Sequence, residues 1–433
     1  MDYTPHTEAD LKQMLERVGA KDLKDLFRDL PQAILDPPLD LEPAKTEAEL
    51  MRHLRDLAAK NQSAQAGFLG GGIRSHHIPA VVPALAARAE FLSAYTPYQP
   101  EASQGLLQAI FEYQTMISEL TGLPVANASM YDGSTALAEG VLLALRESGR
   151  MRVAILKGVH PEYRRVVKTY LDAIGAELVT IASPADPLPP ETGAVVGQNP
   201  DFLGSVHNFT ALAQAAHAAG ALFVAVVDPI SLALLQAPGE YGADIAVGEG
   251  QPLGNAMAFG GPHFGFMAVR ADLVRQLPGR LVSETTDLDG KRGYILTLQA
   301  REQYIRRSKA KSNITTNAQL TALMGAVYLA GLGPEGLKEV ATRSVAMAHA
   351  LAEKLSRIPG VELATPKPFF NEFAVRLPKD VLEVRAALAR RGIAAATPVP
   401  AEYGPNLALL ACTEQHTEAD LDSLAEALRE VLE

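Results

Sequence analysis

Residues 242–265 read GADIAVGEGQPLGNAMAFGGPHFG and contain the strongest indication of the fold class. This stretch begins with a short apolar strand, residues 244–247, and then enters a glycine-rich turn, GEGQP. Just upstream, VAVVDPISL (residues 224–232) is typical of a buried strand that ends in Asp228. Open α/β sheets bind their ligands at such strand ends. The turn carries no lysine, and none occurs from residue 169 to residue 290. No lysine amine of this segment can therefore form an imine with a ligand at the strand end.

Short apolar strands alternate with helices from residue 125 to about residue 330. This alternation predicts a mostly parallel sheet that helices cover on both faces. A long amphipathic helix, residues 101–121, precedes it. Strands are expected at residues 152–156, 177–181, 194–197, 221–227, 244–247 and 264–269, with helices between most of them, as at 161–174 and 208–219.

The chain divides into three predicted parts. Residues 1–100 form an N-terminal helical and loop-rich arm, and residues 101–330 form the large α/β domain. After the sequence GLGP at 331–334 the pattern changes, and residues 331–433 are expected to form a small C-terminal α/β domain. The hexapeptide HTEADL occurs twice, and in both places its threonine, Thr7 or Thr417, predicts a helix cap.

Composition limits the classes of function. The 433 residues carry a formal net charge of −11, which argues against general nucleic-acid binding because phosphate contacts need excess positive charge. A single cysteine, Cys412, excludes an internal disulfide and a cysteine-cluster metal site, and it suits a reducing cytoplasm. No apolar run reaches the roughly 20 residues that span a bilayer. We therefore expect a cytoplasmic protein that uses no metal and binds neither nucleic acid nor membrane.

Several polar residues of the large domain could hold a ligand that carries a phosphate and a nitrogen-containing ring. Ser134 and Thr135 follow a turn and begin a helix, which suits an anion, although such residues also cap ordinary helices. Asp228 could hold a protonated ring nitrogen, or it could cap the loop before the next proline. His160 could stack on a ring, or it could simply lie in the loop before the helix that begins at residue 161.

Two further segments could form the wall of a site. The loop SAYTPYQP, residues 93–100, carries Tyr95, Tyr98 and Gln99, and it could equally be a packing arm or a subunit contact. The segment 292–311 is rich in arginine and lysine and includes Arg301. In an acidic chain such a segment could bind an anionic group or an acidic partner, or it could be a solvated helix face.

Taken together, these motifs resemble one family, the glycine dehydrogenase (decarboxylating), or P-protein, of the glycine cleavage system. The resemblance is to its N-terminal half, which is a separate subunit 1 in many bacteria. The segment from AYTPYQPEASQG to MYDGSTALAEG (94–140) carries it most strongly. LQAREQYIRRSKAKSNITTNAQLTAL (298–323) and the opening stretch extended to residue 270 match two further signatures, and the resemblance covers essentially the whole chain.

The resemblance implies a fold of the aspartate aminotransferase type (pyridoxal-phosphate fold type I), with a mostly parallel, seven-stranded sheet. It also implies that pyridoxal phosphate is bound by the C-terminal half, here a separate subunit 2 with its own lysine, and that Pro252 stands near the corresponding position. This chain would be the half that binds no cofactor. Ser134, Thr135, His160 and Asp228 would be vestiges of the cofactor site.

The resemblance further implies that the two subunits pair, as an α2β2 heterotetramer, and that this chain is inactive alone. Together they would decarboxylate glycine, release CO2 and transfer the aminomethyl group to the lipoyl arm of the H-protein. Tyr95, Tyr98, Gln99 and Arg301 would be candidate contributors to the shared catalytic site. The sequence departs from the family pattern at residues 73–76 (IRSH), which argues against a direct substrate role for Arg74 and Ser75.

Two alternatives stay open at this point. The chain could itself bind pyridoxal phosphate through Lys291, Lys309 or Lys311, although all three lie in a charged segment that is poorly suited to lowering a lysine pKa. It could also be a structural or regulatory subunit that contributes no active-site residue. The first alternative requires one of these lysines at the strand ends.

Overall fold

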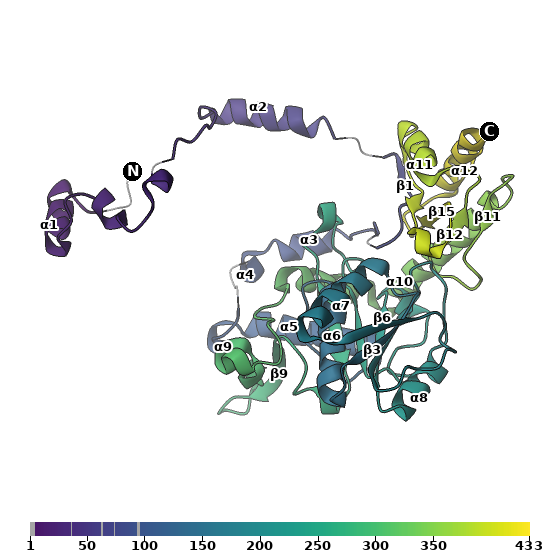
Figure 1. The fold of residues 1–433 in the computed structure, drawn as a ribbon, viewed down its shortest axis with the longest axis horizontal. Coiled ribbons are helices and arrows are strands. Elements are labelled where there is room, and N and C mark those ends of the chain that lie inside the picture. The colour runs from purple at the N-terminus through teal and green to yellow at the C-terminus, as the bar shows by residue number, and fades with distance from the viewer. Residues whose placement is uncertain (1–4, 36, 62–63, 73, 93–95) are drawn as a thin grey trace. The chain divides into compact units, whose positions relative to one another are not determined.

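The computed structural model describes residues 5–35, 37–61, 64–72, 74–92 and 96–433 (Figure 1). They fall into two units, residues 1–63 and residues 64–433. The first unit contains α1 (Glu8–Val18), α2 (Glu47–Ala58) and two 3-10 turns (Lys24–Phe27 and Gln32–Ile34). Thr7 and Thr46 begin the two helices with capping boxes, in which the hydroxyl accepts the N–H of the third helical residue. The cap predicted at Thr7 is confirmed.

The second unit is built around a seven-stranded sheet, and the part of the chain that carries it is called here the large lobe. The strand order is β2-β8-β7-β6-β5-β3-β4. From β4 to β7 the strands are parallel, whereas β8 runs antiparallel to both β7 and β2. The prediction of a mostly parallel sheet is therefore confirmed. The strands are β2 (Val125–Ala126), β3 (Arg152–Leu156), β4 (Glu177–Ile181), β5 (Thr192–Asn199), β6 (Leu222–Val227), β7 (Ile245–Glu249) and β8 (Gly265–Val269).

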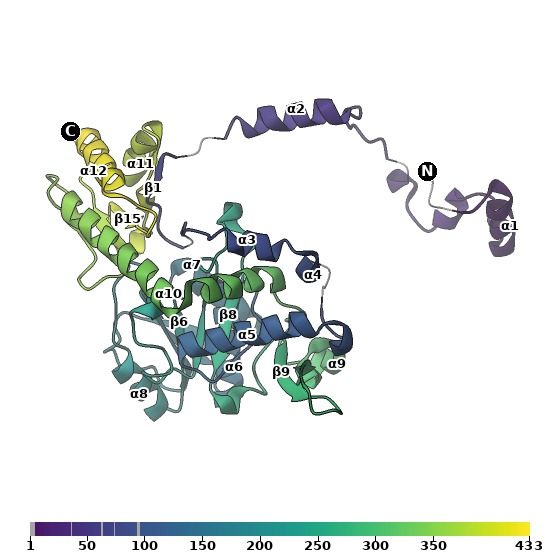
Figure 2. The ribbon, with the colours of Figure 1, turned by 180° about the vertical axis from the view of Figure 1, so that it is seen from behind.

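Helices bury both faces of this sheet. All six residues of β6 are buried, which explains why its sequence is a continuous apolar run and not an alternating one. Figure 1 shows α6 and α7 in front of the sheet, and Figure 2, from behind, shows α5 and α10 side by side. The helices of this lobe are α5 (Gln104–Thr121), α6 (Gly133–Ser148), α7 (Pro161–Ile174), α8 (Thr210–Ala218) and α10 (Gln319–Leu355).

The long helix α10 links the two hydrophobic cores of this unit. Leu337 and Ala341 lie in the core of the large lobe, whereas Ala348 and Leu351 lie in the second core. Gly333 has φ 63° and ψ −178°, so the helix is kinked where the sequence predicts a break. By length and composition alone α10 could cross a bilayer, which the sequence analysis did not find. Its burial in two cores accounts for that apolar composition.

A small lobe follows the kink in α10. Its antiparallel sheet has the order β11-β12-β15-β14 and shares one hydrophobic core with α11, α12 and the C-terminal part of α10. Thr417 begins the last helix with the predicted capping box. The elements are β11 (Glu362–Leu363), β12 (Glu372–Arg376), α11 (Val381–Arg390), β13 (Ile393–Ala394), β14 (Thr397–Pro398), β15 (Leu407–Ala411) and α12 (Glu418–Leu432).

The segment that precedes the large lobe belongs to the second unit. We call residues 64–72 and 74–80 the strap. Its strand β1 (Ala66–Gly67) pairs with β13 of the small lobe. The sequence prediction ended the arm at residue 100, whereas the structure separates the two units at residue 63. Further elements are the short helices α3 (Val81–Ala86), α4 (Ala89–Leu92) and α9 (Gln303–Arg306), and an unpredicted antiparallel hairpin of β9 (Leu281–Thr286) and β10 (Arg292–Thr297).

Candidate functional site

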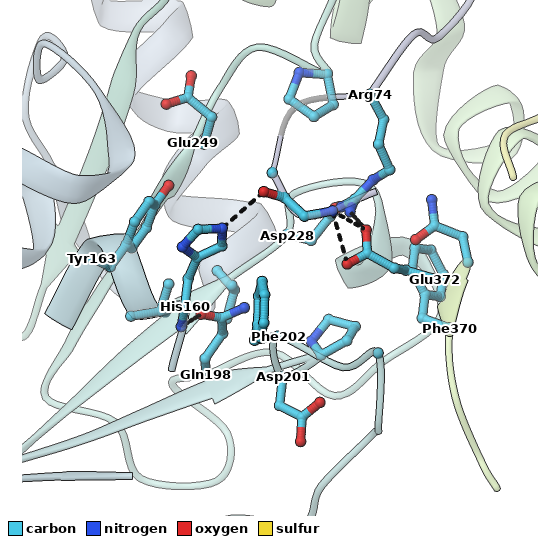
Figure 3. A pocket seen from close by; sticks show the side chains of 18 of the residues that line it. Arg74, His160, Tyr163, Gln198, Asp201, Phe202, Asp228, Glu249, Phe370 and Glu372 are labelled. Atoms are coloured by element: carbon cyan, nitrogen blue, oxygen red, sulfur yellow. Dashed lines mark hydrogen bonds and ion pairs between the residues drawn. The ribbon is translucent and has the colours of Figure 1, made fainter. Parts of the chain in front are cut away.

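A cavity of about 250 Å³ lies at the carboxyl ends of β5, β6 and β7, where the strap and the small lobe meet the large lobe (Figure 3). This is the edge at which open α/β sheets bind ligands. The volume is below the roughly 300–1,000 Å³ of ordinary ligand pockets. Its lining includes Gly71, Gly72 and Arg74 of the strap, His160, Tyr163, Gln198, Asp201, Phe202, Asp228, Glu249 and Pro252 of the large lobe, and Phe370, Asn371 and Glu372 of the small lobe.

The side chain of Arg74 enters this cavity and pairs with a carboxylate from each lobe. Its Nη1 lies 2.6 Å from Oε2 of Glu372, and its Nη2 pairs with Oδ2 of Asp228. The three side chains are only 13%, 11% and 7% exposed for Arg74, Asp228 and Glu372. Burial by itself would lower the pKa of Arg74, but the two carboxylates together raise it. Burial raises the pKa of Glu372, and Arg74 opposes that shift.

Asp228 follows β6 directly, and both of its predicted roles have a counterpart in the structure. Its Oδ1 accepts the N–H groups of Ile230 at 2.9 Å and Ser231 at 3.2 Å, which caps the next turn. Its other carboxylate oxygen, Oδ2, faces the cavity and forms an ion pair with Arg74. Sequence analysis therefore located the acid but missed the cation that holds it.

The start of α6 is the predicted phosphate position, and its N–H groups are already bonded to carboxylates. Oδ1 of Asp132 accepts the N–H groups of Ser134 at 2.7 Å and Thr135 at 2.9 Å, and the Ser134 hydroxyl at 2.6 Å. The N–H of Gly133 donates to Oε2 of Glu249 at 3.0 Å. Ser134 and Thr135 thus lie in the first turn of a helix that Asp132 caps, so neither of them is the cap that the simpler interpretation of this motif predicts.

Glu249 ends β7 and has no close cation partner among the described residues, since the nearest, His263, is 4.0 Å away. Burial therefore raises its pKa to about 7, although the N–H groups of Gly133 and Gln251 oppose the shift. Burial thus favours the protonated form of this carboxyl group more than water does. Glu249 adds a second acid beside the start of α6.

His160 is the N-cap of α7, and both of its ring nitrogens have hydrogen-bond partners. Its Nδ1 accepts the N–H of Glu162 at 3.1 Å, so its Nε2 carries the proton that it donates to the carbonyl of Gly71 at 2.8 Å. Burial lowers its pKa, in agreement with a neutral ring. Phe202 packs edge-on against the ring, with centroids 4.8 Å apart at 75°. The histidine therefore fixes the strap, and its ring nitrogens are not free for a ligand.

Pro252 lines the cavity beside Gln251, which is buried. The Gln251 side chain accepts the N–H of Arg74 at 3.2 Å and donates to the carbonyl of Asn255 at 2.7 Å, so this turn also holds the strap. Within the described ranges no lysine lines the cavity. Lys291, Lys309 and Lys311 are exposed elsewhere on the surface, which rules against the interpretation that one of them acts at the strand ends.

The other predicted residues lie in a second region. Tyr95 lies outside the described residues. Tyr98 and Gln99 are exposed, and Oη of Tyr98 accepts Nη2 of Arg280 at 3.0 Å. We call Tyr98, Arg280, Arg301 and Glu302 the arginine cluster, because Glu302 lies 3.8 Å from Nε of Arg280 and follows Arg301 in the chain.

Arg301 acts as a peg in this cluster. Its guanidinium donates to the carbonyl oxygens of Leu298, Leu277 and Gly279, the first and last at 3.1 Å. Burial lowers its pKa and the neighbouring Glu302 opposes that shift. Burial raises the pKa of Glu302, although both arginines oppose this. The cluster thus holds two arginines against one carboxyl group, and it does not line the cavity.

Comparisons with known proteins place this geometry in a family. The model of the family described as "Glycine cleavage system P-protein" matches residues 1–428. This chain belongs to that P-protein family. A curated protein from Geotalea daltonii, "Probable glycine dehydrogenase (decarboxylating) subunit 1", is 47% identical over 99% of each chain. A crystal structure titled as glycine decarboxylase (P-protein) of the glycine cleavage system, in inhibitor-bound form, is 66% identical over the whole of both chains, with a TM-score of 0.93.

A more distant likeness shows the fold alone. The aspartate aminotransferase structure from Thermus thermophilus is 16% identical, with a TM-score of 0.56 over 85% of this chain and 99% of that one. The fold class that the sequence predicts, aspartate-aminotransferase-like α/β, is therefore confirmed. It agrees with the seven-stranded, mostly parallel sheet and the separate small lobe.

The cofactor that this fold implies, pyridoxal phosphate, does not fit the residues of this P-protein chain. It needs a lysine for attachment, free N–H groups for its phosphate and an acid for its ring nitrogen. Among the described residues no lysine lines the cavity, the N–H groups at the start of α6 are bonded to two carboxylates, and Asp228 is paired with Arg74. Sequence reasoning missed Arg74, Asp132, Glu249 and Glu372. The departure from the family pattern at residues 73–76 was the one available signal for Arg74.

Proposed function

We propose that this chain is the subunit that binds no cofactor in a cytoplasmic, two-subunit glycine dehydrogenase (decarboxylating). With a subunit 2 that binds pyridoxal phosphate, in an α2β2 assembly, it would decarboxylate glycine, release CO2 and transfer the aminomethyl group to the lipoyl arm of the H-protein. The observation that carries the proposal is the P-protein family match over residues 1–428, in a chain where no lysine of the described residues lines the cavity. The chemistry of the cofactor is supplied by the partner.

This chain's own contribution is proposed to come from the arginine cluster and its surroundings, and not from the cavity. Tyr98 and Gln99 are exposed, and the loop that carries them also contains Tyr95. The segment after Arg301 exposes Arg306, Arg307, Lys309 and Lys311, for which the described chain provides no ion pair. An acidic chain with one cationic segment suits an anionic group or an acidic partner. These residues would border the path of the lipoyl arm.

The assignment of the cofactor to the partner has a direct test. The purified chain, alone and with subunit 2, is treated with pyridoxal phosphate and borohydride, and both chains are then mapped by mass spectrometry. We expect a pyridoxyl group on a lysine of subunit 2 and none on this chain. A reduced adduct at Lys291, Lys309 or Lys311 would contradict the proposal.

A contribution from the arginine cluster is tested by Tyr98→Phe, which removes the hydroxyl that accepts Arg280. We expect turnover in the reconstituted complex to fall roughly tenfold, the effect of one misplaced hydrogen-bonding group, while the complex still assembles. Tyr170→Phe on α7 makes the same chemical change away from the cluster and serves as the control. Turnover is measured as glycine-dependent CO2 release.

The alternative function is that of a purely structural or regulatory subunit. Two observations favour it. The cavity is occupied by the chain's own side chains. The guanidinium of Arg301 donates its hydrogen bonds to backbone carbonyls. Equal turnover of Tyr98→Phe, Tyr170→Phe and the parent complex would support this alternative. A fall that is confined to Tyr98→Phe would exclude it.

A further inference from the structure

We infer that Arg74 is a built-in substitute for a cofactor ring: a cation that enters from the strap, is held by Asp228 and Glu372, and keeps the strap and both lobes closed around the cavity. This goes beyond the proposed function, because it concerns the chain by itself and holds whichever residues act in the shared reaction. It also changes the meaning of the missing lysine. The chain has not merely lost an attachment point, since its site has been refilled.

The charges at the end of β6 are arranged as in a cofactor site. An acid at this strand end is the usual partner of a protonated ring nitrogen in pyridoxal enzymes. Here Asp228 and Glu372 hold one guanidinium between them (Figure 3). Arginine is suited to this role because its planar fork can meet two carboxylates and stays charged when buried. The acid is retained, and the cation that it faces comes from the chain itself.

The N–H groups where a phosphate would bind already have partners within the chain. The N–H groups of Gly133, Ser134 and Thr135 form the cup at the start of α6, and all three donate to carboxylates, those of Glu249 and Asp132. A phosphate there would lie beside two acidic side chains and would have no free donor from this turn. Both polar ends of the site are thus satisfied from within the chain.

The strap is hydrogen-bonded to both lobes. The N–H of Gly71 donates to both carboxylate oxygens of Glu372, at 3.2 and 3.3 Å, and its carbonyl accepts Nε2 of His160. A Cβ on Gly70 would lie 3.0 Å from the Glu372 carboxyl group, so the backbone must come this close. Arg74 therefore belongs to a strap that is bonded to the small lobe and to the large lobe.

Among the described residues, this arrangement leaves hydrogen-bond donors in the cavity lining unused. Nε of Arg74 and Nδ2 of Asn371, a residue only 2% exposed, have no hydrogen-bond partner within the described chain. Both residues line the cavity. Removal of the Arg74 side chain would therefore leave a polar space, lined by two carboxylates, of the shape and charge of one alkylguanidinium ion.

The test is chemical rescue of Arg74→Ala in the full-length chain, followed by thermal unfolding. We expect the variant to melt roughly 5 to 10 °C below the parent chain, because one buried carboxylate from each lobe loses its partner. Ethylguanidinium at millimolar concentration, well below denaturing levels, should restore most of this loss. Arg164→Ala is the matched control, since Arg164 also joins the lobes, through Glu402 and Tyr403, but lies outside the cavity lining.

Each outcome decides the inference. Recovery that is confined to Arg74→Ala supports it, whereas equal effects of ethylguanidinium on Arg164→Ala, or no loss of stability in Arg74→Ala, overturn it. Should Arg74→Ala fail to fold, Arg74→Lys is measured instead: it keeps the charge but not the planar fork, so it should melt below the parent chain, and an unchanged melting temperature would overturn the inference. As a second readout, Pro252→Lys restores a lysine to the turn while Arg74 stays in place. A borohydride-reducible pyridoxal phosphate adduct on that variant would show that the lysine alone was missing, and would overturn the inference.

Discussion

The cavity at the strand ends and the arginine cluster both bring guanidinium groups into the protein, but they balance the charge in opposite ways. In the cavity Arg74 faces two carboxylates, and nearby N–H groups are bonded to two more. In the cluster Arg280 and Arg301 share one carboxyl group, that of Glu302. The cavity is closed by groups of the chain, whereas the cluster has excess positive charge and an exposed tyrosine at its edge. Burial of an arginine does not identify a site; its partners do.

The greatest loss of stability is expected from a substitution at the centre of the arginine cluster. Arg280 is 3% exposed, and its Nε and Nη1 have no hydrogen-bond partner in the part of the chain that the structure describes. Arg280→Met should lower the free energy of unfolding by about 3 kcal/mol, because Glu302 and the carbonyl of Thr315 lose their buried partner. The measurement is denaturant unfolding.

The same variant separates the two regions functionally. If the cluster faces the shared site, Arg280→Met should also lower CO2 release in the reconstituted complex by more than its loss of folded protein explains. Arg150→Met, which removes an arginine bonded to the carbonyls of Thr192 and Ala219 far from both regions, provides the control. Equal losses for the two variants would mean that the cluster is structural only.

A smaller effect is expected in the cavity, and it depends on pH. Burial raises the pKa of Glu249 to about 7, above its value near 4.5 in the unfolded chain. The folded state therefore holds this proton more tightly, so its contribution to stability is complete below about pH 4 and is lost as the pH rises to 7. Glu249→Gln removes this dependence. Relative to the parent chain, the variant should gain about 2 to 3 kcal/mol between pH 4 and pH 8.

Urea unfolding of both chains across this pH range measures the difference. Glu414→Gln is a useful contrast, because the hydrogen bond and charge of His76 hold the pKa of that buried carboxyl group below its usual value against the opposing effect of burial. Its stability difference should therefore change with pH in the opposite direction. A flat difference for Glu249→Gln would mean that a cation reaches Glu249 in solution, and that the cavity is less closed than the contacts indicate.

The sequence predicted the fold far better than the details of the site, and the reason is physical. Periodicity and helix caps are local, so the seven strands of the large sheet, except for the two-residue β2, and the helix of residues 161–174 were located. The hairpin β9–β10 was missed because its alternating pattern lies within a charged segment. Asp228 was found because it ends an apolar run.

Arg74 and Glu372 could not be predicted as partners by the same reasoning. They are 298 residues apart and come from the strap and from the small lobe. No periodic pattern relates them, and an arginine in a glycine-rich loop is ordinarily exposed. Only the folded arrangement brings both to the strand end where Asp228 was expected to act. The predicted contributors Tyr98 and Arg301 do lie in one cluster, although the bonds of Arg301 to backbone carbonyls indicate a structural peg.

A still weaker effect is expected at the helix cap that adjoins the cavity residue Glu249, when it is compared with an ordinary helix cap elsewhere. Asp132→Ala removes acceptors for the N–H groups of Ser134 and Thr135, and Asp380→Ala removes the equivalent acceptor at the start of α11. Each should cost about 1 kcal/mol at pH 5.

Asp132 also contributes to the raised pKa of Glu249, so its loss relieves a repulsion once Glu249 ionises. At pH 8 the cost of Asp132→Ala should therefore fall below that of Asp380→Ala, as measured by urea unfolding at both pH values. Equal costs at both pH values would show that the two carboxylates do not interact and that the cup is an ordinary helix start.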